Sequence, residues 1–137
     1  MTAALAEVCR NRAVPLVTGA LYHQGAIARI RRQSAGDVLI AERDQNPNYV
    51  ALPPETLDSA QSRFLELGCT APVNNAPPNA VLAAATEITE TALDLLTNRR
   101  VRPDETIHVI RPLPTDPFTK IGHVTSTAPQ NKTPEPQ

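Results

Sequence analysis

One cysteine stands where a loop could present a reactive thiol. Cys69 follows Gly68 in the stretch LELGCTAPVNNAPPN, and the prolines of residues 70–79 prevent regular structure there. A thiol carried by such a loop could accept an acyl group as a thioester. A position just beyond a helix C-terminus, however, gives no dipole that would lower a thiol pKa. Cys69 is therefore either an acceptor nucleophile or a small apolar residue that happens to end a helix.

The other residues with chemical potential are dispersed. His23, His108 and His123 occur singly, without an H-E-x-x-H, G-x-S-x-G or paired-carboxylate pattern. Each is expected to have a structural or surface role, although His23 lies in a turn where it could contact a partner. Cys9 is expected on the apolar face of a short helix. Two cysteines sixty positions apart form neither a zinc pair nor a disulfide framework, so we expect two thiols and no metal site.

Composition excludes several classes of function. A chain of 137 residues is expected to form one domain, and its formal net charge of −1 gives no attraction for nucleic acid. Charged residues early in MTAALAEVCRNR argue against a secretory signal, and no segment has the roughly 18 apolar residues that cross a bilayer. We therefore expect a soluble cytoplasmic protein without a membrane partner. No glycine-rich phosphate loop is present, which argues against independent nucleotide binding.

The first half of the chain is expected to combine one helix with a hairpin. Residues 3–11, after a capping Thr2, have helical spacing, and residues 14–22 form an apolar run typical of a central strand covered on both faces. A hairpin through Gly25 leads to alternating residues 26–33. Less regular signals follow, namely a possible strand at 38–42, a Pro- and Asn-rich surface loop at 43–55 and a helix at 56–67.

The second half is dominated by a long helix over residues 80–97, capped by Asn79. Its expected core stripe comprises Val81, Leu82, Ala85, Ile88, Ala92, Leu95 and Leu96, opposite Glu87, Glu90 and Asp94. Strands are expected within 105–113 and at 121–126, and residues 127–137 form a Pro-rich tail expected to be disordered. The fold class is thus α/β, a mixed sheet with packed helices, formed by residues 1–126. Because nothing upstream supplies parallel partners for the strand at 14–22, the chain is interpreted as the second half of a larger fold.

Three segments carry a resemblance to a known family: CRNRAVPLVTGALYHQGAIARI, LGCTAPVNNAPPNAVLAAATEITETALDLLTNRR and DETIHVIRPL. Together they resemble the C-terminal half of the ThiF, MoeB and HesA family, which has the ubiquitin-activating-enzyme-like, Rossmann-like adenylation fold. The likeness runs from about Ala6 to Leu113 and includes the A-x-E pattern at Ala85 to Glu87.

This resemblance implies a role in the ATP- and magnesium-dependent activation of a ubiquitin-like or sulfur-carrier protein. By position Cys69 matches the crossover cysteine and would be the acceptor thiol. The family's nucleotide- and magnesium-binding residues lie in the half that this chain does not contain, so no cofactor is expected for this chain alone. A partner chain would supply the ATP-binding half, or the chain would form a homodimer. The family's zinc cysteines are absent, and residues 37–39 stand near the place of the first pair.

Two other interpretations compete with an adenylyltransferase half. The first is a noncatalytic interaction module, derived from that fold, which dimerises through its apolar strands. Under this hypothesis, Cys69→Ser leaves every activity and partner affinity unchanged. The second is a small mixed α/β binding domain whose likeness to the family is chance.

Overall fold

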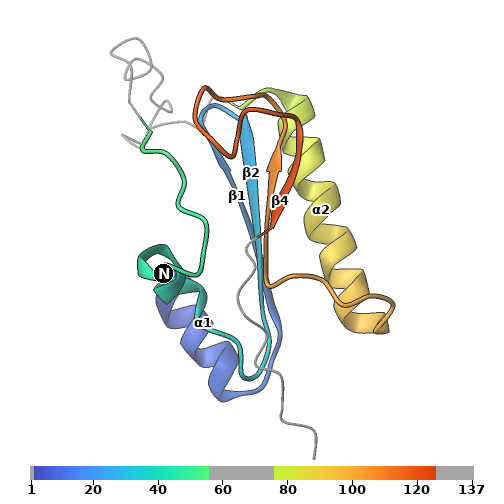
Figure 1. Ribbon diagram of the computed structural model, residues 1–137. Helices are drawn as coiled ribbons and strands as arrows, with labels where there is room; N and C mark the ends of the chain where they lie inside the picture. Colours follow the sequence, from blue (N-terminus) through green and yellow to red (C-terminus); the bar gives the residue numbers. More distant parts are fainter. Residues whose placement is uncertain (1, 56–75, 126–137) are drawn as a thin grey trace, which may run out of the picture.

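The computed structural model describes residues 2–55 and 76–125 as one sheet with a helix on each face. In chain order the elements are α1 (Thr2–Asn11), β1 (Leu16–Tyr22), β2 (Ile27–Gln33), the 3-10 helix η1 (Ile40–Gln45), α2 (Pro78–Thr97), β3 (Glu105–Val109) and β4 (Gly122–Thr125). Helix α2 covers one face, while α1, η1 and the segment that follows η1 lie on the other (Figure 1). The expected helix 56–67, Cys69 and the tail 127–137 fall outside the described residues.

The sheet is antiparallel throughout its described strands, in the order β1-β2-β3-β4. The α/β class with packed helices is confirmed, but the expected mixed sheet is wrong. Helix α2 joins β2 to a neighbour that runs the opposite way, so the connection does not make the parallel crossover on which the mixed sheet depended.

The predicted hairpin is confirmed, and its turn contains two further residues with positive φ besides the glycine. His23, Gln24 and Gly25 have φ values of 52°, 56° and 79°, a conformation that suits the twist of a tight hairpin. A Cβ on Gly25 would lie 2.8 Å from Cβ of Ala80, so glycine also allows the turn to pass beneath the start of α2.

The roles expected for the first two strands are exchanged. The apolar β1, predicted to be central and covered, lies at one end of the strand order and is half-buried to exposed. The arginine-bearing β2 is the buried inner strand. The prediction was wrong because it assumed that the more apolar strand is the more buried one. The charges of β2 are buried with partners: Arg29 donates from Nε to Oε1 of Glu105 at 2.8 Å.

Helix α1 begins and ends close to the predicted bounds, but the apolar face on which Cys9 was expected is not buried. Leu5 and Val8 are exposed, Cys9 is half-buried, and Ala6 is buried. The Gln33 amide accounts for this, because its Nε2 donates to the Ala6 carbonyl at 2.8 Å and its Oε1 accepts from the Ile40 amide at 3.0 Å. The same contact holds residues 40–45 as a 3-10 helix where a strand was considered.

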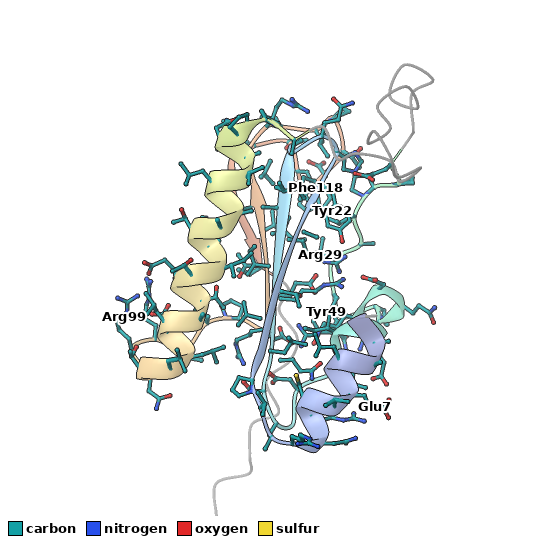
Figure 2. All side chains as sticks on the ribbon, turned by 180° about the vertical axis from the view of Figure 1, so that it is seen from behind. Glu7, Tyr22, Arg29, Tyr49, Arg99 and Phe118 are labelled. Carbon is teal, nitrogen blue, oxygen red and sulfur yellow. The ribbon has the colours of Figure 1, made fainter. Side chains whose placement is uncertain are left out.

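The main core lies on the face of the sheet away from α2. It comprises Ala26, Ile27, Ile107, Val109 and Phe118, with Tyr22, Val50, Leu52, Leu113 and Val124 packed around it. Figure 2 shows Tyr22, Tyr49 and Phe118 on this side and Arg99, just beyond the end of α2, across the sheet. The strand predicted within 105–113 is confirmed as β3, whose Ile107 and Val109 enter the core while His108 points toward the α2 side.

Strand β4 confirms the brief strand predicted near the end of the folded region. Among the residues that the structure describes, no helix combines the length and apolar character needed to cross a membrane.

Candidate functional site

Helix α2 contributes residues to two of the features described below, an exposed face and a polar cluster. Its observed span, Pro78–Thr97, agrees with the predicted 80–97. The N-cap is Pro77, however, and Asn79 lies inside the first turn without the predicted capping role. Asn98 takes the left-handed conformation at the C-terminus, with φ 50°. A proline start and an asparagine stop thus fix the helix ends.

The face that α2 buries differs from the predicted stripe. Ala80, Ala84, Thr91 and Asp94 are buried, whereas Val81, Leu82 and Leu96, all assigned to the core by periodicity, are 52%, 69% and 80% exposed. Small residues on the buried face let the helix lie close to the sheet. A Cβ on Gly19 of β1 would stand 2.4 Å from Cδ1 of Ile88, so the sequence of β1 accommodates that closeness.

Asp94 is buried because basic residues beyond the helix converge on it. Arg99 and Arg100 donate from Nε to its carboxylate at 2.8 and 3.1 Å, and Arg102 makes a further charged hydrogen bond. Led by the Arg102 hydrogen bond, these contacts lower the pKa of Asp94 to about 2. These three arginines, which follow the helix in sequence, therefore turn back over the last turn of α2.

The outer face of α2 carries no charge. Its exposed residues are Pro78, Asn79, Val81, Leu82, Ala85, Thr86, Thr89, Leu93, Leu96 and Thr97. Leu82, Thr89 and Leu96 recur every seven residues, so they form one line along the helix. An exposed helix face normally carries charged side chains, and an uncharged apolar face is typical of an interaction surface. We call this set the outer face.

Threonine hydroxyls make the outer face still less polar. Thr86 Oγ1 donates to the Leu82 carbonyl at 2.9 Å, and Thr89 Oγ1 donates to the Ala85 carbonyl at 2.8 Å. Because these hydroxyls bond back to the helix, fewer of their hydrogen-bonding groups require water.

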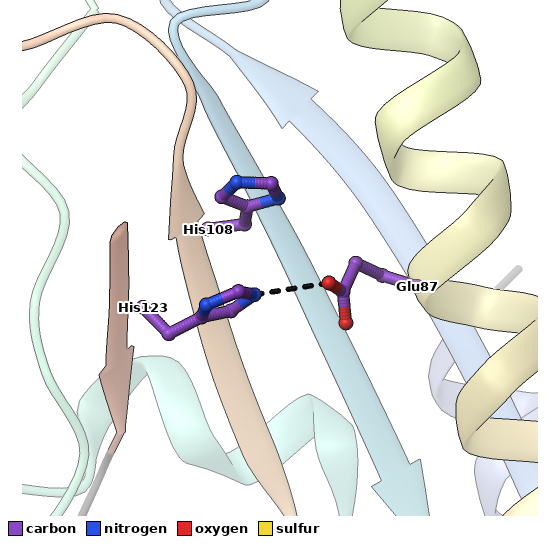
Figure 3. A group of neighbouring side chains, drawn as sticks. All are labelled: Glu87, His108 and His123. Atoms are coloured by element: carbon purple, nitrogen blue, oxygen red, sulfur yellow. Dashed lines mark hydrogen bonds and ion pairs between the residues drawn. The ribbon is translucent and has the colours of Figure 1, made fainter. Parts of the chain in front are cut away.

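A polar cluster lies on the flank of α2 that faces β3 and β4. It consists of Glu87, His108 and His123, whose side chains converge in Figure 3. His108 and His123 are direct partners in the β3–β4 register, and their rings stack with centroids 4.5 Å apart. His123 Nε2 lies 2.9 Å from Oε1 of Glu87.

The electrostatics of this cluster favour neutral imidazole at its centre. His108 Nδ1 is buried and has no hydrogen-bond partner among the described residues. Burial, and then the neighbouring His123, lower the pKa of His108, while Glu87 acts in the opposite direction. An unpaired buried nitrogen is a costly feature, because it has lost water without gaining a partner.

The three side chains have the composition of a metal-ligand set. Each can offer one ligand atom, and these atoms lie within 4.8 Å of one another. His108 and His123 were predicted to be isolated because 14 residues lie between them in the chain. Their positions on two predicted neighbouring strands are the signal that could have indicated a pair. His23, by contrast, lies apart with its Nε2 2.9 Å from the Pro53 carbonyl.

A second feature is a hollow of about 650 Å³ on the core side of the sheet. It is lined by Arg29 and by most of the segment predicted as a surface loop at 43–55, which includes Arg43. Both arginines are occupied within the chain: Arg29 pairs with Asp44 and Glu105, and Arg43 donates to the carbonyls of residues 32, 38 and 104. The charges of this hollow therefore hold the fold together rather than offer a ligand site.

Tyr49 completes this buried network. Its hydroxyl bonds to Asp104, and its ring centroid lies 5.2 Å from the Arg43 guanidinium carbon. Burial, followed by that hydrogen bond, raises the pKa of Tyr49 to about 12. The hydroxyl is thus a structural donor, with no tendency to act as a base near neutral pH.

No protein-family model matches this chain, and no curated protein or solved structure is significantly similar to it. The ThiF-type resemblance, with Cys69 as acceptor, stays a prediction. Cys69 lies outside the described residues, so none of the sites above includes it.

Proposed function

We propose that this protein is a noncatalytic interaction module that pairs with a second copy of itself through the outer face of α2. The single observation that carries the proposal is that the ten most exposed residues of this 20-residue helix are all uncharged. The interaction-module hypothesis placed dimerisation on apolar strands. The proposal places it on the helix.

A second copy suits this face because the face is self-complementary. In an antiparallel pair about a twofold axis, Leu82 of one helix meets Leu96 of the other, and Thr89 lies near the axis. No charge on the face opposes itself, so like-charge repulsion does not disfavour the pair. Small residues between the leucines, Ala85 and Thr89, allow the helices to approach closely.

The charges of α2 lie where they do not obstruct this contact. Glu90 and Asp94 bind Arg99, and Glu87 binds His123 and Arg102, all within the chain. A partner helix would therefore bury leucine and threonine side chains without stripping water from an unpaired charge.

The adenylating interpretation supplies a different function and a different test. In it the chain contributes a docking surface for a ubiquitin-like or sulfur-carrier protein, and Cys69 accepts the activated carboxyl group in the presence of ATP, magnesium and a partner chain. Its support remains the sequence resemblance alone. The antiparallel sheet adds none.

Sedimentation equilibrium of the native chain and of Leu82→Glu tests the proposal. We expect the native chain to dimerise with a dissociation constant on the order of 10 µM, which corresponds to roughly 7 kcal/mol. Leu82→Glu should be mostly monomeric at about 100 µM, which requires a loss of at least about a hundredfold in affinity. Leu82 is 69% exposed and glutamate is a good helix former, so this change should not unfold α2.

Val8→Glu is the matched control. Val8 is 52% exposed on α1, and the change places the same charge on an exposed apolar residue away from the outer face. It should leave the dimer intact. A native chain that is monomeric at about 100 µM, or equal dissociation by both variants, would overturn self-pairing.

A further inference from the structure

We infer that Glu87, His108 and His123 form a three-ligand site for Zn²⁺. The site goes beyond the proposed pairing, because it lies on the polar flank of α2 and includes no residue of the outer face.

The donor set selects the class of metal. Two imidazole nitrogens with one carboxylate oxygen suit borderline transition metals, whereas magnesium and calcium prefer oxygen ligands throughout. Three protein ligands leave the fourth position of a tetrahedral zinc ion to water or another small ligand. The cluster therefore resembles zinc sites with one free coordination position more than structural zinc sites, in which four protein ligands complete the coordination.

The orphaned nitrogen gives an independent reason for a ligand. His108 Nδ1 is buried without a hydrogen-bond partner among the described residues, in a cluster where the other two side chains are paired with each other. A metal ion would give this nitrogen a partner, and so remove the cost of leaving it unsatisfied.

The fold holds two of the ligands and leaves the third adjustable. His108 lies on an inner strand, and Glu87 is half-buried with its second oxygen 3.5 Å from Nη1 of Arg102. His123 is 47% exposed at the end of the strand order. Ligand atoms within 4.8 Å must close to roughly 3.3 Å in a tetrahedral zinc site. Rotation of His123 out of the ring stack would supply that movement.

Arg102 would act as an orienting residue behind the ligand carboxylate. It contacts Glu87 and also makes a charged hydrogen bond with Asp94, so its positive charge near the metal is already balanced. Binding of one carboxylate oxygen to Arg102 would leave the other for zinc.

The test is a Zn²⁺ titration by calorimetry, combined with NMR of the imidazole nitrogens. The native chain should bind one equivalent of zinc per chain, with chemical-shift changes at His108 and His123 and none at His23. Removing a direct ligand should weaken binding more than the roughly 100-fold loss that an outer contact can cause. We expect that loss for His123→Gln and for the isosteric Glu87→Gln.

His23→Gln is the matched control, because it removes a half-buried histidine that lies outside the cluster. It should bind zinc as the native chain does. Two thiols are alternative zinc ligands, so a Cys9→Ser/Cys69→Ser variant should also retain the affinity. Circular dichroism without metal checks that His123→Gln is folded, as the exposure of His123 predicts.

Three results would each overturn the site: no zinc binding by the native chain, unchanged affinity in folded His123→Gln, or loss of binding in the cysteine variant. Since Leu82→Glu lies on another face of α2, it should keep its zinc affinity. The dimer and the metal site can therefore fail independently.

Discussion

At the scale of single residues, Glu105 shows why an arginine-rich strand can be buried. Its carboxylate is fully buried and contacts Arg29 and Arg31 of the neighbouring strand. The alternation of β2 predicted correctly which residues share a face, but it could not reveal that the face bearing arginines is enclosed. The burial of this face depends on the carboxylates of Asp44 and Glu105, and their position beside the arginines is set by tertiary structure.

Glu105→Gln should lower the free energy of unfolding by about 3 kcal/mol, because it removes the buried one of the two carboxylates, Asp44 and Glu105, that balance Arg29 and Arg31. Urea denaturation at neutral pH measures the change. The exposed Glu42→Gln serves as the control and should shift stability by less than about 0.5 kcal/mol. Equal effects for the two substitutions would show that the buried pair adds nothing to stability.

At the scale of elements, α2 was predicted well in extent and poorly in orientation. Its bounds follow from local signals, the prolines before it and the polar residues after Leu96. Its rotation does not, because Asp94 is buried only after Arg99, Arg100 and Arg102 fold back upon it. Hydrophobic spacing cannot separate a core stripe from an apolar outer face when both occur on one helix.

The closeness of α2 to β1 leads to a prediction at Gly19. Gly19→Ala should destabilise the fold by about 1 to 3 kcal/mol, since the new methyl group would clash with Ile88. Thermal or urea unfolding gives the value. Adding Ile88→Val removes the clashing Cδ1 atom, so the double variant should recover part of the loss. If Gly19→Ala is neutral, the contact between α2 and β1 is looser than described.

At the scale of the whole molecule, the candidate metal site was invisible to the sequence because its residues meet only through tertiary pairing. His108 and His123 become neighbours through the β3–β4 register, and Glu87 reaches them from α2. The predicted nucleophile Cys69 and its surrounding helix and loop stay predictions. Composition and local patterns predicted the α/β class, most element positions and the hairpin, whereas strand order and burial depended on distant partners.

Acid stability of the whole protein should report the Asp94 network. The pKa of Asp94 falls from 3.8 to about 2, so its contribution is present above pH 4 and is lost as the pH falls toward 2. The native chain should exceed Asp94→Asn in urea stability at pH 6, and the difference should shrink between pH 4 and 2. A difference that does not change with pH would assign the loss to packing, not to charge.

The strand order also determines how the chain must assemble. The β1–β2 turn and the β3–β4 connection join neighbours, so each hairpin can form locally within microseconds. The seam between β2 and β3 is different: Arg29 and Glu105 stand 76 residues apart. Bringing these two strands together costs chain entropy before the contacts between them can form and stabilise the fold. The rate of folding is therefore expected to depend on the pairing of two preformed hairpins. The contacts between the arginines of β2 and Glu105 of β3 should form only in this late step.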